Sequence, residues 1–339
     1  MAISQLAYFA WRRVEPRLSN LTRSLAEVRK PLPSWTDSAT SEGIVQFVRR
    51  VTNPSSPLFV PPDERIAVFD SDGTLWCEQP ASALAFFVMH RLRDQSPEHL
   101  CLLDPALVDA AERGDIEFFQ RLDLDQLSDI LLQTNAGLTP EQFVTQAHRF
   151  LARSLHPRFG VPFRELTYRP MLELLAFLQA KDFRPFIVTG GGVEFVRAAS
   201  EQLYGVPTER VAGATVDYSF ERLDGKILVI RTRTLLGEPG EGEAKVRAIQ
   251  HRIGRRPILA AGNSVGDEEM LEYTRSGQNA SLCLLVEHDD AVREYAYDSH
   301  IESPARDSWL TVSMRHDFRR LFAKPTSVPA PGPRMLNVS

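Results

Sequence analysis

The feature that most constrains the fold is a short apolar run that ends in paired carboxylates, within the stretch Phe69-Asp70-Ser71-Asp72-Gly73-Thr74-Leu75-Trp76. Residues 65–69, preceded by two prolines and followed closely by a glycine, predict a buried strand of a parallel sheet. Open α/β sheets bind ligands at the loops that leave the carboxyl ends of such strands. Because Gly73 lets the chain turn at once, Asp70 and Asp72 can point into one small volume.

Two neighbouring carboxylates repel each other unless a cation or an exchanged proton lies between them. The pair therefore favours one of two arrangements. The first is a divalent metal site, in which hard oxygen ligands favour magnesium over zinc. The second is a nucleophile paired with a general acid/base. The simpler alternative is an Asp-Gly turn that closes a hairpin.

A second apolar run, residues 184–188, ends in Thr189 and the glycines Gly190, Gly191 and Gly192, before a helical pattern over residues 193–204. A hydroxyl group and free backbone N–H groups at a helix start form an anion cradle. The alternative is a capping threonine followed by a flexible glycine loop.

Two later motifs also carry charged or polar side chains that could reach the same edge of the sheet. Lys245 lies in the first turn of a helical stretch that opens at Gly242, where it can neutralise a phosphate or, alternatively, remain solvated. A third strand-like run, residues 257–261, is followed by Gly262-Asn263-Ser264-Val265-Gly266-Asp267. Each motif alone is ordinary, but the ordered series of Asp-x-Asp, Thr, Lys and Asn-x-x-x-Asp is specific.

With these motifs the sequence resembles the haloacid dehalogenase-like (HAD) hydrolase superfamily, and within it the phosphoserine-phosphatase-like branch, over about residues 65 to 300. The resemblance implies that Asp70 is a nucleophile that carries an aspartyl phosphate and that Asp72 is the general acid/base. It implies that Thr189 and Lys245 bind the phosphoryl group, beside Gly73 and Gly190. Magnesium would be held by Asp70, Asp72, Asn263 and Asp267.

Two details refine this resemblance. Members that displace halide lack an acid at the position of Asp72, so its presence favours a phosphatase over a dehalogenase. Many relatives carry Gly-Asp where this chain has Gly262-Asn263, so one carboxylate is missing. Either Asp267 compensates directly or through water, or the affinity for magnesium is weakened. Alternatively, Asn263 is only a turn residue.

The predicted fold is α/β, a doubly wound parallel Rossmann-like sheet with a helical cap inserted after the first strand and a β-hairpin excursion. Residues 61–76 and 166–322 are expected to form the core, and residues 77–165 the cap, in which Thr139-Pro140-Glu141-Gln142 is a capping box. Its phenylalanines, at 86, 87, 118 and 119, are expected in the cap core. Residues 1–60 are expected to form a helical extension, and residues 323–339 a disordered proline-rich tail.

Residues 211–233 alternate apolar and polar positions around Asp224-Gly225, which predicts an antiparallel hairpin attached to the sheet. The run 282–286 predicts another buried strand. His288 and the Asp289-Asp290 pair follow it. They border the active site or, on the simpler interpretation, form an exposed acidic turn. Glu78 lies roughly where phosphoserine phosphatases carry a carboxylate for the substrate amine, but the spacing differs.

Composition agrees with a cytoplasmic enzyme. The net charge of −5 provides no basic footprint for nucleic acid, and the three cysteines have no CxxC spacing, which indicates reduced thiols. No apolar run is long enough to cross a bilayer, and no signal-peptide layout is present. The basic segment 6–30 is interpreted as a frayed or docked amphipathic helix rather than a membrane anchor.

The predicted function is magnesium-dependent hydrolysis of a phosphomonoester, a small phosphorylated metabolite, through an aspartyl-phosphate intermediate. Three alternatives stay open. A receiver domain also clusters Asp, Thr and Lys, although it has no cap insertion. A phosphometabolite sensor would keep the phosphate cradle without catalysis, and a phosphomutase would transfer the group between positions of a sugar.

Overall fold

The computed structural model of the chain describes residues 31–96, 99, 103–237 and 239–323. Its main sheet contains, within those residues, seven strands in the order β3-β2-β1-β6-β7, with β8 and β9 both paired to β7. All pairs are parallel except β7 with β8. The strands are β1 (Ile66–Phe69), β2 (Arg184–Val188), β3 (Val211–Ala212), β6 (Leu259–Gly262), β7 (Leu282–Asp289), β8 (Ala296–Tyr297) and β9 (Leu310–Ser313). The predicted doubly wound α/β sheet is therefore confirmed.

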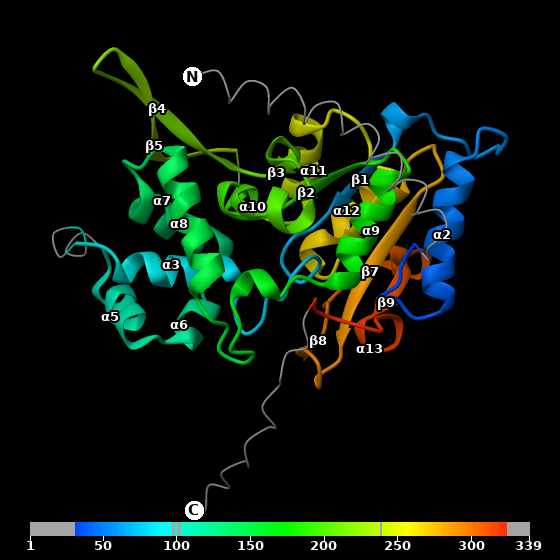
Figure 1. Cartoon of the computed structure of the whole chain (residues 1–339), viewed down its shortest axis with the longest axis horizontal. Coiled ribbons are helices and arrows are strands. Elements are labelled where there is room, and N and C mark those ends of the chain that lie inside the picture. The colour runs from blue at the N-terminus through cyan, green and yellow to red at the C-terminus, as the bar shows by residue number, and fades with distance from the viewer. Residues whose placement is uncertain (1–30, 97–98, 100–102, 238, 324–339) are drawn as a thin grey trace, which may run out of the picture.

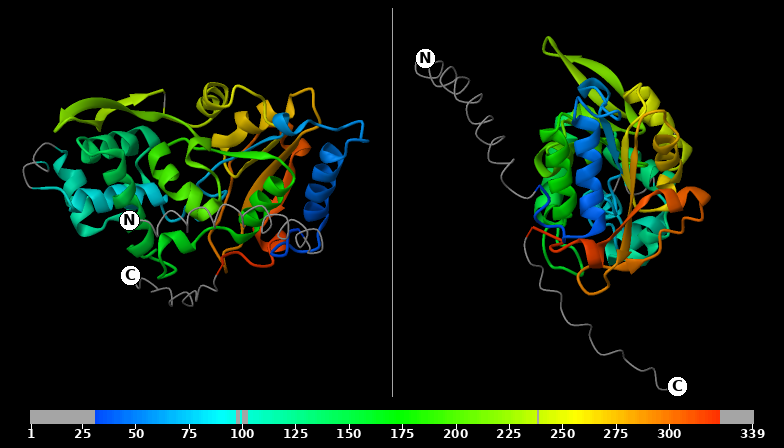
Figure 2. Two further views of the ribbon diagram at one scale, coloured as in Figure 1. Left: turned by 45° about the horizontal axis from the view of Figure 1, so that its top comes forward. Right: turned by 90° about the vertical axis from the view of Figure 1, so that its right-hand side faces the viewer.

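Strand β1 is buried on both faces because helices cover the sheet from both sides (Figure 2). Ala67 and Phe69 belong to a core cluster that includes α2 and α9, whereas Ile66 and Val68 belong to a second cluster that includes α11 and α12. This alternation is the period-two geometry of a strand. The helices are α2 (Ala39–Thr52), α9 (Arg169–Ala180), α11 (Glu243–Arg252) and α12 (Glu268–Arg275).

Strand order reverses at β1. From β1 the chain proceeds outward through β2 and β3, and it then returns to the other side of β1 to form β6 and β7. The loops after β1 and β6 therefore leave the sheet at a topological switch point, the usual ligand-binding position in open α/β sheets. Asp70 and Asn263 stand at the starts of these two loops.

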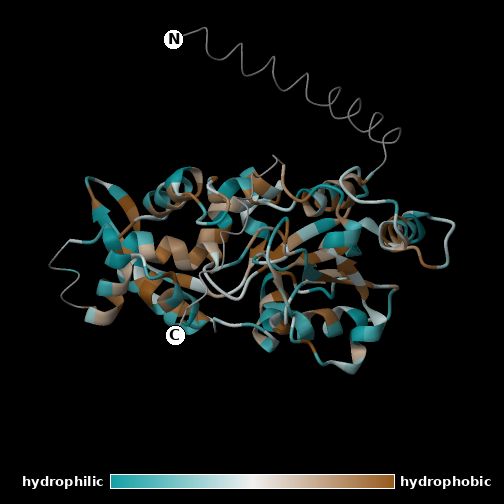
Figure 3. Ribbon diagram, turned by 90° about the horizontal axis from the view of Figure 1, so that it is seen from below, coloured by the Kyte–Doolittle hydropathy of each residue, from teal (hydrophilic) through white to brown (hydrophobic). Residues whose placement is uncertain are grey.

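In the sequence, a group of helices is inserted between β1 and α9. In space this helical part lies to the left of the sheet in Figure 1. Its helices are α3 (Ala83–Arg93), α5 (Pro105–Arg113), α6 (Ile116–Gln120), α7 (Leu124–Asn135) and α8 (Pro140–Arg153). Helix α8 begins as its capping box predicts, since Thr139 accepts from the Gln142 N–H and Gln142 accepts from the Thr139 N–H. Apolar residues are found in the interiors of both the helical part and the sheet part (Figure 3).

The hairpin is present, but the predicted attachment to the main sheet is wrong. Strands β4 (Thr215–Leu223) and β5 (Lys226–Leu236) form a separate two-stranded sheet that turns at Asp224-Gly225. Backbone hydrogen bonds join Arg231 to Gly137 and Leu138, in the loop between α7 and α8. The Arg231 side chain is buried, pairs with Glu194 and lies over the ring of Phe143. These contacts hold the hairpin on the helical part.

The remaining segments pack on the sheet. Helix α2 contacts β9, and Trp35 bridges to Phe318 near α13 (Met314–Asp317). Helix α10 (Val193–Ala199) follows β2, and a single π-helical turn extends it to Tyr204. The expectations for residues 1–30 and for 324–339 lie outside the described residues. No helix in the described ranges combines the length and apolarity that a bilayer crossing needs.

Candidate active site

The first motif, residues 69–76, and Lys245 lie side by side in the structure, although they are far apart in the sequence. The Lys245 Nζ atom donates to Asp70 Oδ1 at 2.7 Å and to Asp267 Oδ1 at 2.6 Å. The Lys245 side chain is only 2% exposed, so the alternative of a solvated helix lysine is wrong. Lysine is rarely buried without an ionic partner, and two carboxylates fill that role here.

Asp267 is held rigidly at the start of α12. Its Oδ2 atom accepts from the backbone N–H groups of Asn263 at 2.9 Å and Ser264 at 3.1 Å. The residue is completely buried. Both of its carboxylate oxygens therefore have donors within the protein, which positions the oxygen that faces Lys245.

The electrostatics of this group favour a bound cation. Burial and the neighbouring Asp267 carboxylate raise the pKa of Asp70, and Lys245 opposes that rise. Burial alone disfavours the ammonium form of Lys245, yet Asp267 and Asp70 raise its pKa above the ordinary value. Lys245 therefore stays protonated, and the remaining negative charge would be stabilised by a further cation.

Asp72 has a different environment from Asp70. Its Oδ1 atom accepts from the Trp76 indole N–H at 2.8 Å. Burial, followed by repulsion from Glu78, raises the pKa of Asp72 to about 7. A carboxyl group with that pKa is suited to give and take protons near neutral pH.

Gly73 makes this turn possible. Its φ of +71° lies in the left-handed region, and its N–H donates to the Trp76 carbonyl at 2.9 Å. A Cβ atom at this position would collide with the side chains of Asn263 and Glu78. The glycine is therefore required both by backbone conformation and by the close approach of the loop after β6. The alternative of a hairpin turn is wrong, since no hairpin forms here.

Thr189 lies at the end of β2, next to the end of β1. Its hydroxyl donates to the Gly191 carbonyl at 2.9 Å, within its own loop, so the structure does not join it directly to Asp70. A Cβ atom at Gly190 would lie 2.9 Å from the Leu124 Cδ1 atom and 3.1 Å from the Gly240 carbonyl oxygen. The first turn of α7 therefore covers the glycine loop, and bulkier residues do not fit beneath it.

Asn263 is buried and contacts the first motif. Its Oδ1 atom accepts from the Thr74 hydroxyl at 3.1 Å, and its Nδ2 group donates to Glu78 Oε1 at 2.8 Å. Glu78 also accepts from the Tyr297 hydroxyl at 2.6 Å. Sequence reasoning noticed Glu78 but not Tyr297, because no local pattern among residues 293–300 marks Tyr297 as a site residue.

The interpretation of His288 as part of an exposed acidic turn is wrong. Its Nε2 atom lies 2.8 Å from the Gly73 carbonyl oxygen, and its Nδ1 atom lies 3.2 Å from Glu294 Oε2. The pairing of β8 with β7 at Tyr297 folds the chain back over His288 and buries it. His288 therefore supports the turn of the first motif. This role depends on a contact with Gly73, which lies 215 residues earlier in the sequence.

A divalent cation fits this group of residues. Within the described part of the chain, no three His, Cys, Asp or Glu side chains form a ready metal cage. Magnesium, however, usually keeps several waters and takes few protein ligands. The carboxylate of Asp70 and the amide oxygen of Asn263 are hard donors of the right kind. Lys245 pairs with Asp70 and Asp267, and the Glu78 carboxylate lies near enough to Asp72 to raise its pKa. A cation bound beside these crowded carboxyl groups would offset their repulsion.

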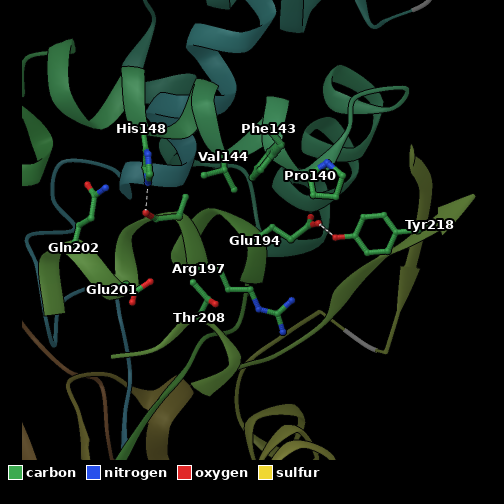
Figure 4. A pocket seen from close by; sticks show the side chains of 11 residues that line it. Pro140, Phe143, Val144, His148, Glu194, Arg197, Glu201, Gln202, Thr208 and Tyr218 are labelled. Carbon is green, nitrogen blue, oxygen red and sulfur yellow. Dashed lines mark hydrogen bonds between the residues drawn. The ribbon is translucent and has the colours of Figure 1, made fainter. Parts of the chain in front are cut away.

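A separate cavity of about 370 Å³ lies between α8 and α10, beside β4 (Figure 4). Glu194 and the Tyr218 hydroxyl form a hydrogen bond at one end, and His148 contacts the Ala198 carbonyl at 2.5 Å. None of the site residues predicted from the sequence lines this cavity. It therefore belongs to the junction between the helical part and the sheet part, not to the carboxylate cluster.

The comparison with protein families agrees with this fold. Residues 67–272 match the family of haloacid dehalogenase-like hydrolases, and since this is more than half of the chain, the chain belongs to that family. The resemblance noted from the sequence is therefore confirmed at the level of the family. None of the curated proteins matches this sequence.

Solved structures with a similar fold include a conserved functionally unknown protein from Anaerococcus prevotii. It is 15% identical, with 74% of this chain and 86% of that chain covered and a TM-score of 0.47. A HAD family hydrolase from Salmonella enterica is 17% identical, with 76% and 69% covered and a TM-score of 0.39. A phosphoserine phosphohydrolase-like protein from Francisella tularensis is 20% identical, with 66% and 88% covered and a TM-score of 0.35.

Proposed function

We propose that this protein is a magnesium-dependent phosphomonoester hydrolase of the phosphoserine-phosphatase-like branch, acting through an aspartyl-phosphate intermediate on a small phosphorylated metabolite. The observation that carries the proposal is the ammonium group of Lys245, which lies between Asp70 and Asp267 at the switch point of the sheet. Family membership supports hydrolase chemistry. Asp72, two residues after the nucleophile, supports phosphate rather than halide as the group transferred.

In the first step, a carboxylate oxygen of Asp70 attacks the phosphorus atom and the bond to the leaving oxygen breaks. Asp72 donates its proton to that oxygen, so an alcohol departs. Its raised pKa of about 7 leaves Asp72 substantially protonated at neutral pH, which suits this role. Lys245 offsets the negative charge that collects between Asp70 and the phosphoryl group.

In the second step, water attacks the phosphorus atom of the aspartyl phosphate while Asp72 takes its proton. The bond between Asp70 and phosphorus breaks, inorganic phosphate is released, and both carboxyl groups return to their starting states. The Thr189 hydroxyl and the N–H groups of the glycine loop are the proposed donors to the phosphoryl oxygens. Turning the Thr189 hydroxyl from Gly191 toward a ligand needs only a side-chain rotation.

Asp70, the backbone carbonyl of Asp72 and Asn263 are the proposed magnesium ligands. Both oxygens of Asp267 already accept hydrogen bonds. We therefore propose that its negative charge acts on the cation indirectly, through its contact with Lys245 and through water. When bound, magnesium would withdraw charge from the phosphoryl oxygens and hold the phosphate in place. Asp70 and Lys245 would then position the phosphorus for attack.

The Asp70→Asn variant tests this proposal. Its amide cannot act as the nucleophile, so magnesium-dependent phosphate release should fall by at least about 10³-fold, equivalent to about 4 kcal/mol in activation free energy. Asp63→Asn is the matched control, since Asp63 is an exposed carboxylate shortly before the same strand. Phosphate release should be measured on a panel of phosphorylated amino acids, sugars, nucleotides and lipid head groups, with thermal melts to check folding.

The same assay separates the alternatives. Multiple turnovers that require Asp70 support the hydrolase. A single phosphate retained on each chain would support a receiver-like role, and binding without release would support a phosphometabolite sensor. Transfer of the phosphoryl group to another position of a sugar, seen by product analysis, would indicate a phosphomutase.

A further inference from the structure

The side-chain amide of Asn263 has a fixed orientation. Its nitrogen donates to Glu78 at 2.8 Å, and its oxygen accepts from Thr74 at 3.1 Å. An amide turned over would place its oxygen against the Glu78 carboxylate, two acceptors with no proton between them, so this orientation is strongly disfavoured. Glu78 therefore determines which end of the amide faces the first motif.

Glu78 is itself held in place from the opposite side. The Tyr297 hydroxyl donates to it at 2.6 Å, and the Tyr297 ring stacks on His288 with 4.2 Å between the ring centroids. His288 in turn contacts the Gly73 carbonyl oxygen at 2.8 Å. The carboxylate thus belongs to a chain of contacts that starts and ends at the first motif, and it has little freedom to rotate away.

We infer that Glu78 is a positioning residue that points the Asn263 oxygen toward the cation and contributes the negative charge that the amide lacks. This inference rests on the proposed function for the cation, although the contact between the two side chains does not. An aspartate at position 263 would face Glu78 across the present 2.8 Å contact, and two buried carboxylates at that separation repel each other. The amide at 263 and the carboxylate at 78 are therefore expected to work only as a pair.

Three variants of the full chain test the inference: Glu78→Gln, Asn263→Asp and the combined Glu78→Gln/Asn263→Asp. The combined variant exchanges the carboxylate and the amide between the two positions. Melting temperatures without metal report how much the contact between Glu78 and residue 263 stabilises the fold. Calorimetric titration with MgCl₂ measures the affinity for the cation. Glu287→Gln is the matched control, because Glu287 is a partly buried carboxylate with an ion pair to Arg306 at 2.9 Å.

Without metal, Asn263→Asp is expected to melt several degrees below wild type, and the combined variant is expected to recover most of that loss. Glu78→Gln is expected to weaken magnesium binding about tenfold, because the amide of Asn263 loses its orientation and one charge is removed. The combined variant should return to within about threefold of wild-type affinity. A merely structural role for Glu78 would change the melting temperature without this recovery of affinity.

Additive effects of the two substitutions, on melting or on magnesium affinity, would overturn the inference. So would unchanged magnesium affinity in Glu78→Gln. Failure of the proposed function has a different signature, since wild type itself would then bind no magnesium or release no phosphate. The control Glu287→Gln should match wild type in magnesium affinity throughout.

Discussion

The loops at the switch point and the helical part beside them are stabilised by different interactions. At the switch point the contacts are ionic and short, as between Lys245 and its two carboxylates. In the helical part and at its junction with α10 they are aromatic: Phe87 meets Phe143 and Phe150 of α8 edge to face and stacks on Phe195 of α10 at 4.9 Å. The first region fixes individual atoms, whereas the second fills volume.

This difference separates two functions of the site. Ionic contacts at fixed distances can hold a nucleophile, an acid and a phosphate in reacting geometry. Apolar packing between helices can exclude water and set the space available to a substrate, and it tolerates substitution better. We therefore expect chemistry to depend on the first region and substrate preference on the second.

The largest effect is expected from removing the ammonium group at the centre of the switch-point contacts, which are called the ionic region below. Lys245→Met leaves Asp70 and Asp267 buried without a counter-charge, so the free energy of unfolding should fall by about 3–5 kcal/mol at pH 8. Phosphate release should fall by at least about 10²-fold. Denaturant melts and steady-state kinetics measure the two effects.

Burial and the Asp267 carboxylate raise the pKa of Asp70, so the stability loss in Lys245→Met should shrink as the pH falls and Asp70 becomes neutral. Lys226→Met, at the exposed turn of the hairpin, is the control and should change neither quantity measurably. Equal effects of the two substitutions would contradict the separation of the two regions.

A second prediction concerns His156, in the helical part, whose Nε2 atom lies 2.7 Å from the Gln79 carbonyl oxygen. Burial lowers the pKa of His156 to about 4, so the folded protein resists protonation that the unfolded chain accepts near pH 6.5. Its contribution to stability is therefore complete above about pH 6.5 and is lost as the pH falls toward 4. The expected loss is about 2–3 kcal/mol.

The measurement is the difference in unfolding free energy between wild type and His156→Gln across pH 4 to 7.5. That difference should decrease steadily toward low pH. His316→Gln, on α13, provides the comparison for a histidine on an exposed position. A difference that stays constant with pH would show that His156 is not kept neutral by burial.

The smallest expected effect concerns the contact between the glycine loop after β2 and helix α7 of the helical part. In Gly190→Ala the new methyl group meets Leu124 of α7, and either the glycine loop or the helix must shift. Catalytic efficiency, kcat/KM, should fall about tenfold with little change in stability, because the loop is proposed to hold the phosphoryl oxygens. Adding Leu124→Ala should recover part of the loss.

Gly43→Ala is the matched control, since the nearest atom to its new methyl group, Leu310 Cδ2, is 3.6 Å away. It should leave kcat/KM unchanged. If Leu124→Ala recovers none of the efficiency lost in Gly190→Ala, the helix does not restrict the loop.

The sequence predicted the ionic region better than its surroundings. Asp70, Thr189 and Asn263 each follow an apolar strand, so a local pattern reveals both the strand and the residue at its end. The approach of Lys245 to Asp70 was expected from the resemblance to the family, whereas the residues around Lys245 alone left a solvated helix lysine open. The helices of the inserted segment were also predictable, because their apolar spacing and capping residues are local signals.

What the sequence did not reveal depends on long-range pairing. The hairpin lies on the helical part because Arg231 meets Glu194 and Phe143, an ion pair and a cation–π contact without a local signature. His288 is buried because β8 folds back on β7, although polar residues surround it in the sequence. The contact between Glu78 and Tyr297 joins residues 219 positions apart.

The most direct test of the account is to stop the wild-type protein with acid during turnover of a phosphomonoester in the presence of magnesium and to locate the phosphoryl group by mass spectrometry. The account predicts one phosphoryl group on the peptide that contains Asp70, bound as a hydroxylamine-sensitive acyl phosphate, and none in Asp70→Asn. A phosphoryl group on another residue, or steady turnover by Asp70→Asn, would contradict it.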